Sequence, residues 1–337
     1  MQRWQGLKAV GDHAGPSVVT IGNFDGVHRG HAAVLQQVVA AARERDCAAI
    51  AVTFDPHPLQ VLFPDRAPVV IAGLEHRLDL MDQQGLDATL VLEFTPELAT
   101  WSPERFVREV FVETLRARAV VVGRDIRFGH RNAGDLQTLR DLGSALGFEV
   151  LVLDDQGEDD RSEAESGLPR FSSTAVREAL ATGDVRRAAE ILGHPHRVVS
   201  TVVHGDHRGR ELGYPTANLS TAAAEQAGHV PADGVYAGWL ERLDERPGAE
   251  GGRRLAAAIS VGTNPTFDGL ERRVEAYCID RTGLDLYGEQ VAVEFVEMLR
   301  PTLRFDGIEA LVEQMALDVQ RCRELLGLPG AGTPGGA

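Results

Sequence analysis

The chain has 337 residues, of which 43% are hydrophobic and 25% charged, a composition typical of a globular protein with more than one domain. Its formal net charge of -16 argues against a protein that grips nucleic acid or an anionic membrane through charge. Lys8 is the only lysine. A Walker loop and a protein kinase, which both need a lysine at the phosphates, are therefore excluded.

Three cysteines, Cys47, Cys278 and Cys322, are widely spaced and form neither a zinc pattern nor a disulfide framework. We expect them to be buried apolar residues of a protein in a reducing compartment. We see no signal peptide and no apolar run long enough to span a membrane. These features predict a cytoplasmic protein without nucleic-acid or membrane partners, and they leave a homo-oligomer open.

The first half of the sequence alternates apolar strand patterns with helical patterns. The predicted strands cover residues 17–21, 47–54, 88–92, 119–122 and 149–153. The predicted helices cover residues 32–45, 74–84, 103–115 and 135–146. Ser102 is expected to cap the helix that opens with Pro103. This alternation predicts a parallel sheet covered by helices on both faces.

The second half has a different pattern. After an acidic, polar segment at residues 154–167, expected to be a surface loop, a helix broken at Gly183 is predicted over residues 174–192. Short strands at residues 198–203, 234–240, 255–261, 274–279 and 291–299 predict an antiparallel barrel or sandwich. A last helix is predicted at residues 307–326, with Asp306 as its N-cap. The predicted domains are residues 1–184 and 185–328, followed by a disordered tail at 329–337.

A first candidate site follows the first predicted strand, where residues 22–31 read GNFDGVHRGH. His28 and His31 stand three residues apart at a helix start, where backbone amides favour anions. Ligands of parallel sheets bind at the carboxyl ends of strands, and imidazoles there can stabilise phosphate charge. Two surface histidines in a glycine-bearing turn are the simpler alternative, but this position and the glycines favour phosphate binding.

GNFDGVHRGH, TFDPHP (residues 53–58), VVGRDIRFG (121–129) and FSSTAVR (171–177) together resemble the N-terminal module of the bacterial bifunctional riboflavin kinase/FMN adenylyltransferase (FAD synthetase) family. Serine and threonine hydroxyls at a helix start, beside an arginine, suit a pyrophosphate leaving group, although helix capping alone also explains them. The resemblance implies an ATP- and phosphate-binding set of Gly22, Asn23, Phe24, Asp25, Gly26, His28, His31, Arg170, Ser173 and Thr174.

Four further residues follow other predicted strands of this half. Asp55 and His57 stand in TFDPHP, and Asp125 and Phe128 come after the strand at residues 119–122. We expect them to line the flavin or nucleotide pocket, with Phe128 stacking on a ring. For Asp55 and His57, turn residues fixed by the neighbouring prolines are an equally good interpretation.

A second candidate site lies in residues 205–219, which read GDHRGRELGYPTANL. Glycine amides and arginines can cradle phosphates, and the Thr216 hydroxyl and Asn218 amide oxygen are suitable Mg²⁺ ligands beside ATP. Taken alone, this segment, which contains a Pro-Thr-Ala-Asn turn, is better explained as an ordinary glycine-rich hairpin loop with its arginines in solvent. The predicted ATP-binding set of this half is Gly205, Arg208, Gly209, Arg210, Gly213, Pro215, Thr216 and Asn218.

PADGVYAG (residues 231–238), SVGTNPTFDG (260–269), RRVEAYCID (272–280) and DLYG (285–288) follow in order. With the Pro-Thr-Ala-Asn element they resemble the riboflavin kinase module of the same family. The resemblance implies that Glu275 is the general base, which takes the proton from the ribityl 5′-hydroxyl as the γ-phosphate arrives. Strand alternation alone would also permit a solvent-facing glutamate.

Together these patterns predict an α/β parallel-sheet nucleotidyltransferase domain followed by an antiparallel β-barrel riboflavin kinase domain with a C-terminal helix. The predicted enzyme phosphorylates riboflavin to FMN with ATP, then adenylylates FMN to FAD and releases pyrophosphate, with Mg²⁺ balancing the triphosphate charge. One alternative is a different acceptor, such as a pyridine mononucleotide or phosphopantetheine. Another is a flavin sensor or partner-binding protein in which one module has lost catalysis.

Overall fold

The computed structural model describes residues 1–11, 15–153, 171–205, 213–220, 227–244, 252–266, 269–281 and 283–329. The acidic segment at 154–167 and residues 330–337 of the predicted tail lie outside these ranges. The chain forms two compact units, Met1–Val70 with Leu74–Ser173 and Ile71–Gly73 with Thr174–Ala337. The domain boundary expected between residues 184 and 185 stays a prediction.

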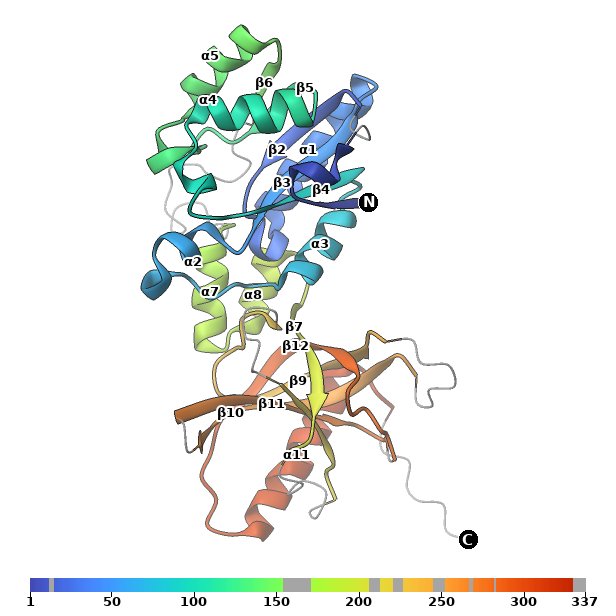
Figure 1. The fold of residues 1–337 in the computed structure, drawn as a ribbon. Coiled ribbons are helices and arrows are strands. Elements are labelled where there is room, and N and C mark those ends of the chain that lie inside the picture. Colours follow the sequence, from blue (N-terminus) through green and yellow to red (C-terminus); the bar gives the residue numbers. More distant parts are fainter. Residues whose placement is uncertain are drawn as a thin grey trace, which may run out of the picture. The chain divides into compact units, whose positions relative to one another are not determined.

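The first unit is built on a parallel sheet with the strand order β1–β4–β3–β2–β5–β6, as predicted (Figure 1). Buried apolar clusters form its core. Only the edge strand β1 was missed, because its sequence QRWQ buries a single side chain, Trp4. The strands are β1 (Gln2–Gln5), β2 (Ser17–Ile21), β3 (Ala48–Asp55), β4 (Ala88–Glu93), β5 (Ala117–Val122) and β6 (Glu149–Val152).

Four of the described α-helices of this unit were predicted, and the short helix α2 at Pro58–Leu62 was missed. Ser102 caps α4 as predicted, since its hydroxyl accepts from the Arg105 amide at 3.1 Å. The helix continues from α4 into a π-helical segment, Val107–Thr114. Helix α1 starts at Arg29 rather than at residue 32, which places His31 in its first turn. The described helices are α1 (Arg29–Glu44), α2 (Pro58–Leu62), α3 (Leu74–Asp82), α4 (Pro103–Phe106) and α5 (Leu136–Leu146).

The second unit is a closed antiparallel barrel with the strand order β10–β11–β8–β7–β12–β9, preceded by α7 (Ser173–Thr182) and α8 (Val185–Leu192) (Figure 1). The two helices are separated at Gly183, as predicted, where φ is 81°. The long helix α11 (Ile308–Leu326) packs on the barrel through Cys322. The strands are β7 (His196–Val203), β8 (Thr216–Leu219), β9 (Gly234–Arg242), β10 (Arg254–Thr266), β11 (Gly269–Cys278) and β12 (Gln290–Pro301).

Two local expectations for this unit were wrong. The Pro-Thr-Ala-Asn element does not form a turn: Thr216–Leu219 is strand β8, because Ala217 and Leu219 alternate into the core while the strand pairs with β11. Asp306 does not cap the last helix. The helix starts one position later than expected, so extended Gly307 is the N-cap and no side chain caps the first turn.

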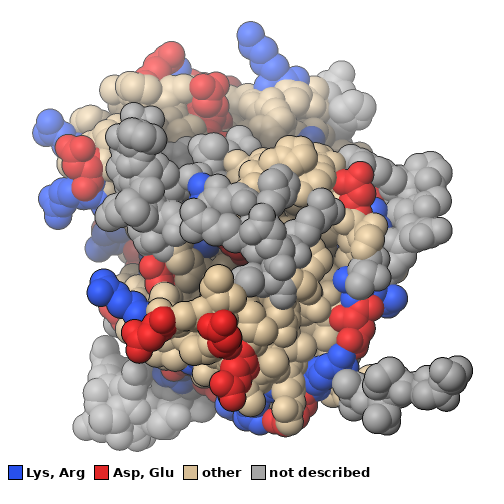
Figure 2. Space-filling model, turned by 90° about the horizontal axis from the view of Figure 1, so that it is seen from below, with Lys and Arg blue, Asp and Glu red and all other residues tan. Residues whose placement is uncertain are grey.

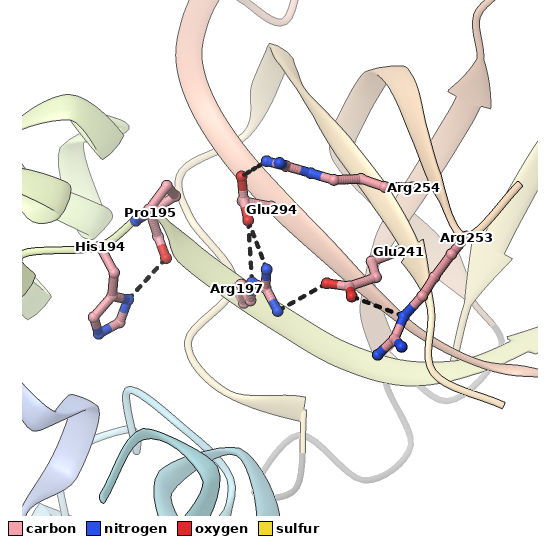
Figure 3. A network of polar contacts seen from close by, with 7 residues as sticks. All are labelled: His194, Pro195, Arg197, Glu241, Arg253, Arg254 and Glu294. Carbon is pink, nitrogen blue, oxygen red and sulfur yellow. Dashed lines mark hydrogen bonds and ion pairs between the residues drawn. The ribbon is translucent and has the colours of Figure 1, made fainter. Parts of the chain in front are cut away.

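A chain of ion pairs links four neighbouring strands of the barrel (Figure 3). Glu294 on β12 accepts from Arg197 on β7 at 2.9 Å and from Arg254 on β10 at 2.6 Å. Arg197 also reaches Glu241 on β9 at 3.0 Å, and Glu241 contacts Arg253. Glu294 is nearly buried, so its carboxylate depends on both arginines for compensation.

The surface mixes both charge signs. Figure 2 shows lysine and arginine side chains beside aspartate and glutamate side chains on the face that it presents. All three cysteines are free, and burial raises the pKa of the Cys278 and Cys322 thiols to about 12, whereas Cys47 is partly exposed. Within the described part of the chain, no helix combines the length and apolarity that crossing a bilayer requires.

Candidate active sites

The loop between β2 and α1 has an unusual backbone. Phe24, Gly26 and Val27 all have positive φ, at 48°, 74° and 42°. Such values are costly for a bulky or β-branched residue and persist only where the surroundings impose them. Phe24 and Val27 are each 2% exposed, so core packing holds this loop in shape. The predicted site residue Phe24 therefore contributes its buried ring to the core of the unit.

His28 and His31 lie together at the start of α1. His28 is the N-cap, and its Nδ1 accepts from the His31 amide at 3.3 Å. The two rings stack with centroids 3.7 Å apart. Burial, and then the neighbouring His28, lower the pKa of His31 well below its ordinary value. The His31 ring is therefore neutral at pH 7, and its shielded Nδ1 has no partner among the described residues.

Acidification is expected to destabilise the first unit through His31. Unfolding returns its pKa to the ordinary value, so the unfolded chain binds more protons as the pH falls from about 7.5 to about 5.5. The contribution of the neutral His31 ring to the free energy of unfolding is complete above the pKa that His31 has in the unfolded chain. It is lost as the pH falls below that value. Denaturant unfolding at several pH values checks this, and a His31→Gln protein should lose less stability on acidification. An identical pH dependence of the two proteins would contradict it.

Small residues make room for this arrangement. A Cβ on Gly30 would lie 3.2 Å from the His28 ring, and one on Gly22 would lie 3.0 Å from the Phe24 ring. Ser173, at the start of α7, donates its hydroxyl to the Asp25 carbonyl at 3.3 Å. The structure thus brings Ser173 to the loop. Thr174 already belongs to the second unit, and Arg170 lies outside the described residues.

The end of β3 lies beside this loop, because β2 and β3 are paired neighbours. His57 caps α2: its Nδ1 accepts from the Leu59 amide at 3.2 Å, so a neutral ring carries its proton on Nε2. That nitrogen lies 3.1 Å from the Asn23 side-chain amide. This contact joins the side chains that follow β2 and β3.

Asp55 and the residues after β5 complete the predicted pocket set. Burial raises the pKa of Asp55, although Arg77, 3.6 Å away, opposes this. Asp125 is exposed. Phe128 is 7% exposed and packs its ring on Gly134, where a Cβ would lie 2.8 Å from the ring. The structure thus puts Phe128 in the core of the unit.

Sequence analysis missed Arg77 on α3. The arginine is 3% exposed and donates to the carbonyl oxygens of Asn23 and Phe54, at the ends of β2 and β3. Its signal was present in the sequence, since Arg77 stands at helical spacing among Leu74, Leu78 and Met81, the apolar face of α3. A cation in an apolar stripe is rare unless it is paired.

The second site lies on the paired strands β8 and β11. Glu275 stands directly opposite Asn218, and the Thr216 hydroxyl donates to Glu275 Oε2 at 3.3 Å. Asn218 donates its Nδ2 to the Thr216 carbonyl at 3.2 Å, which leaves its side-chain oxygen for another partner. The pairing therefore places hydroxyl, amide and carboxylate oxygens on one face. Arg208, Gly209 and Arg210 lie outside the described residues.

Gly205 packs directly on this cluster. A Cβ at that position would lie 2.5 Å from the Asn218 side-chain amide, so no larger residue fits without moving Asn218. Gly213, with φ 85°, has open space around it, and Pro215 directly precedes β8. Among the described members of the predicted set, Gly205, Thr216, Asn218 and Glu275 are brought together.

We predict that Gly205→Ala lowers by about 100-fold the riboflavin phosphorylation that the sequence resemblance implies, because displacing a positioned group by an ångström has effects of this size. FAD formation from supplied FMN should be unchanged, since the resemblance assigns that chemistry to the other unit. Gly252→Ala, at an open position with φ 86°, tests the effect of a glycine replacement as such. Riboflavin turnover by Gly205→Ala equal to that of the Gly252→Ala protein would contradict the packing argument.

Comparison with known proteins gives a consistent result for both units. The FAD synthetase family model matches residues 11–166, and the riboflavin kinase family model matches residues 192–326. The bifunctional riboflavin kinase/FMN adenylyltransferase of Escherichia coli K12 is 35% identical over 311 residues, covering 92% of this chain and 93% of the relative. The Listeria monocytogenes protein of the same name is 33% identical and covers 91% of each chain.

A solved structure also matches the whole chain. It is described as a macrolide-efflux protein from Streptococcus pneumoniae and is 29% identical, with a TM-score of 0.80. The match covers 96% of this chain and 99% of that protein.

Proposed function

Because this chain belongs to the bifunctional riboflavin kinase/FMN adenylyltransferase family, we propose that the β2–α1 loop binds ATP for adenylyl transfer and that β8 and β11 carry the kinase site. The N-terminal part is the FAD synthetase domain and the C-terminal part is the riboflavin kinase domain. The enzyme phosphorylates riboflavin to FMN and adenylylates FMN to FAD. The kinase domain favours FMN over a pyridine mononucleotide or phosphopantetheine as the acceptor.

In the first site, the FMN phosphate attacks the α-phosphorus of ATP and pyrophosphate leaves. His28 and His31 would donate to phosphate oxygens as their charge grows, with Asn23 beside them. His31 suits this role because its neutral ring has one N–H donor and carries no charge in the free enzyme. Asp55, His57, Asp125 and Phe128 stay predictions as pocket residues, as do Ser173, Thr174 and Arg170 as ligands of the leaving group.

In the second site, Glu275 would take the proton from the ribityl 5′-hydroxyl as that oxygen attacks the γ-phosphorus. The observation that carries this assignment is the contact between Glu275 and the Thr216 hydroxyl, opposite Asn218. Thr216 and Asn218 would also hold Mg²⁺, since oxygen ligands beside ATP suit this ion. The ion would supply charge neutralisation of the triphosphate.

Incubation of the protein with riboflavin, ATP and Mg²⁺, followed by chromatography of the flavins over time, tests the proposal. FMN should appear first and FAD second, and omission of Mg²⁺ should stop both. If riboflavin binds but is not converted, the alternative of a flavin sensor that has lost catalysis would be favoured. The cytoplasmic location and a homo-oligomer stay predictions.

A further inference from the structure

A buried cation joins two loops of the first unit. The Arg77 guanidinium donates to the Asn23 carbonyl at 3.2 Å and to the Phe54 carbonyl at 2.9 Å, and lies 3.6 Å from the Asp55 carboxylate. Burial lowers the pKa of Arg77, but an arginine stays protonated in proteins. Arg77 is only 3% exposed, and removing its charge from water costs free energy. Only the hydrogen bonds and the ion pair with its partners offset that cost.

The two carbonyls mark the points where β2 and β3 end. Asn23 is followed by Phe24 in the left-handed region, so the chain departs from the strand directly after the carbonyl that Arg77 holds. Phe54 precedes the segment that leads to His57, whose ring contacts the Asn23 side chain. Asn23 is therefore held twice, through its carbonyl by Arg77 and through its amide by His57.

We infer that Arg77 is a positioning residue for adenylyl transfer, which acts by holding the two strand-end loops in one fixed relation rather than by touching ATP. This inference rests on the proposed function of the β2–α1 loop. The planar guanidinium bonds the two carbonyls through two different nitrogens in a fixed geometry, whereas a lysine has a single ammonium nitrogen on a flexible stem. The catalytic geometry therefore depends on an arginine at this position.

A positioning role differs from a purely structural one in what a substitution changes. Removing one partner of a buried charge pair is destabilising, so a substitution of Arg77 is expected to lower stability in either role. Asp55 is 49% exposed, so water can solvate its carboxylate once the arginine is gone, but Asp25, the other charge partner of Arg77, is only 2% exposed. The two roles therefore differ in activity, measured at a temperature where the protein stays folded: a positioning role predicts a loss confined to adenylyl transfer.

The test is Arg77→Met in the full-length protein. We expect kcat for FAD formation from FMN to fall by about 100-fold, with a smaller change in the KM for ATP, because displaced loops affect the transition state most. The unfolding temperature should fall, because two carbonyls and the Asp25 carboxylate lose Arg77 as a partner, whereas riboflavin phosphorylation, measured well below that temperature, should stay at its wild-type value. Arg77→Lys should restore part of the activity, since a lysine keeps the positive charge but lacks the rigid fork that fixes the two carbonyls.

Arg3→Met is the matched control. Arg3 also bonds α3, through Glu75 at 2.9 Å and Asp79 at 2.5 Å, but it touches neither strand-end loop. Its FAD formation should stay within about twofold of wild type. Wild-type kcat in Arg77→Met would overturn the inference, and so would a parallel loss of unfolding temperature, kcat and riboflavin phosphorylation. The wild-type protein tests the proposed function: if it formed no FAD, both the proposed function and this inference would be wrong. If it formed FAD, the Arg77→Met protein would test this inference alone.

Discussion

Glu275→Gln is expected to stop FMN formation from riboflavin while FAD formation from supplied FMN continues. Glutamine keeps the size of the side chain and can still contact the Thr216 hydroxyl, but it cannot take a proton from the substrate. Loss of a general base lowers rates by about 100- to 10,000-fold. The measurement is the initial rate of each conversion in the same preparation.

Glu313→Gln is the control for this substitution, since it makes the same chemical change at an exposed position of α11. Both conversions should proceed at wild-type rates in that protein. Undiminished riboflavin phosphorylation in Glu275→Gln would remove Glu275 as the base. The assignment would then pass to another group near the β8–β11 pair.

The second large effect is expected from His28→Ala combined with His31→Ala, which should halt the reaction sequence at FMN. The two stacked rings are the side-chain donors at the start of α1, and losing one such donor costs about 100- to 1,000-fold in rate. Riboflavin phosphorylation should continue, so FMN should accumulate in a chromatographic time course that starts from riboflavin.

His130→Ala is the matched control in the same unit, because His130 is exposed and its Nδ1 lies 2.9 Å from the Ala99 carbonyl oxygen. It should form FAD normally. The single His31→Gln protein, which keeps a polar side chain, separates loss of a donor from loss of packing against Phe24. Normal FAD output from the double variant would refute the phosphate assignment.

Regular elements were predictable where burial and periodicity agree. Strand β2 was predicted with its observed bounds, because an apolar β-branched run that is buried on both faces is typical of a central strand in a parallel sheet. Strand β8 was read as a turn, because proline and asparagine dominate turn statistics and only the pairing with β11 makes this short segment a strand. Helix α11 was found, but its N-cap was not, since caps depend on local backbone angles.

The residues of the candidate sites were also predictable only in part. Motif residues such as His28, Thr216 and Glu275 were readable because their chemistry and order along the chain are informative. Phe128 stays a prediction as a pocket residue, and only the tertiary structure shows that its ring packs on Gly134. Whether a side chain faces a ligand or the core depends on neighbours that are distant in sequence.

By itself, the sequence determined that two modules are present and which short motifs they carry, because these depend on residue type and local order. Its resemblance to a known family indicated which phosphate chemistry each module performs. The tertiary structure decided the contacts that join segments far apart. Asn218 and Glu275 meet only through strand pairing, and Arg77 reaches Asn23 only because α3 packs near the ends of β2 and β3. Such contacts are set by the cooperative packing of whole elements, which no local pattern encodes.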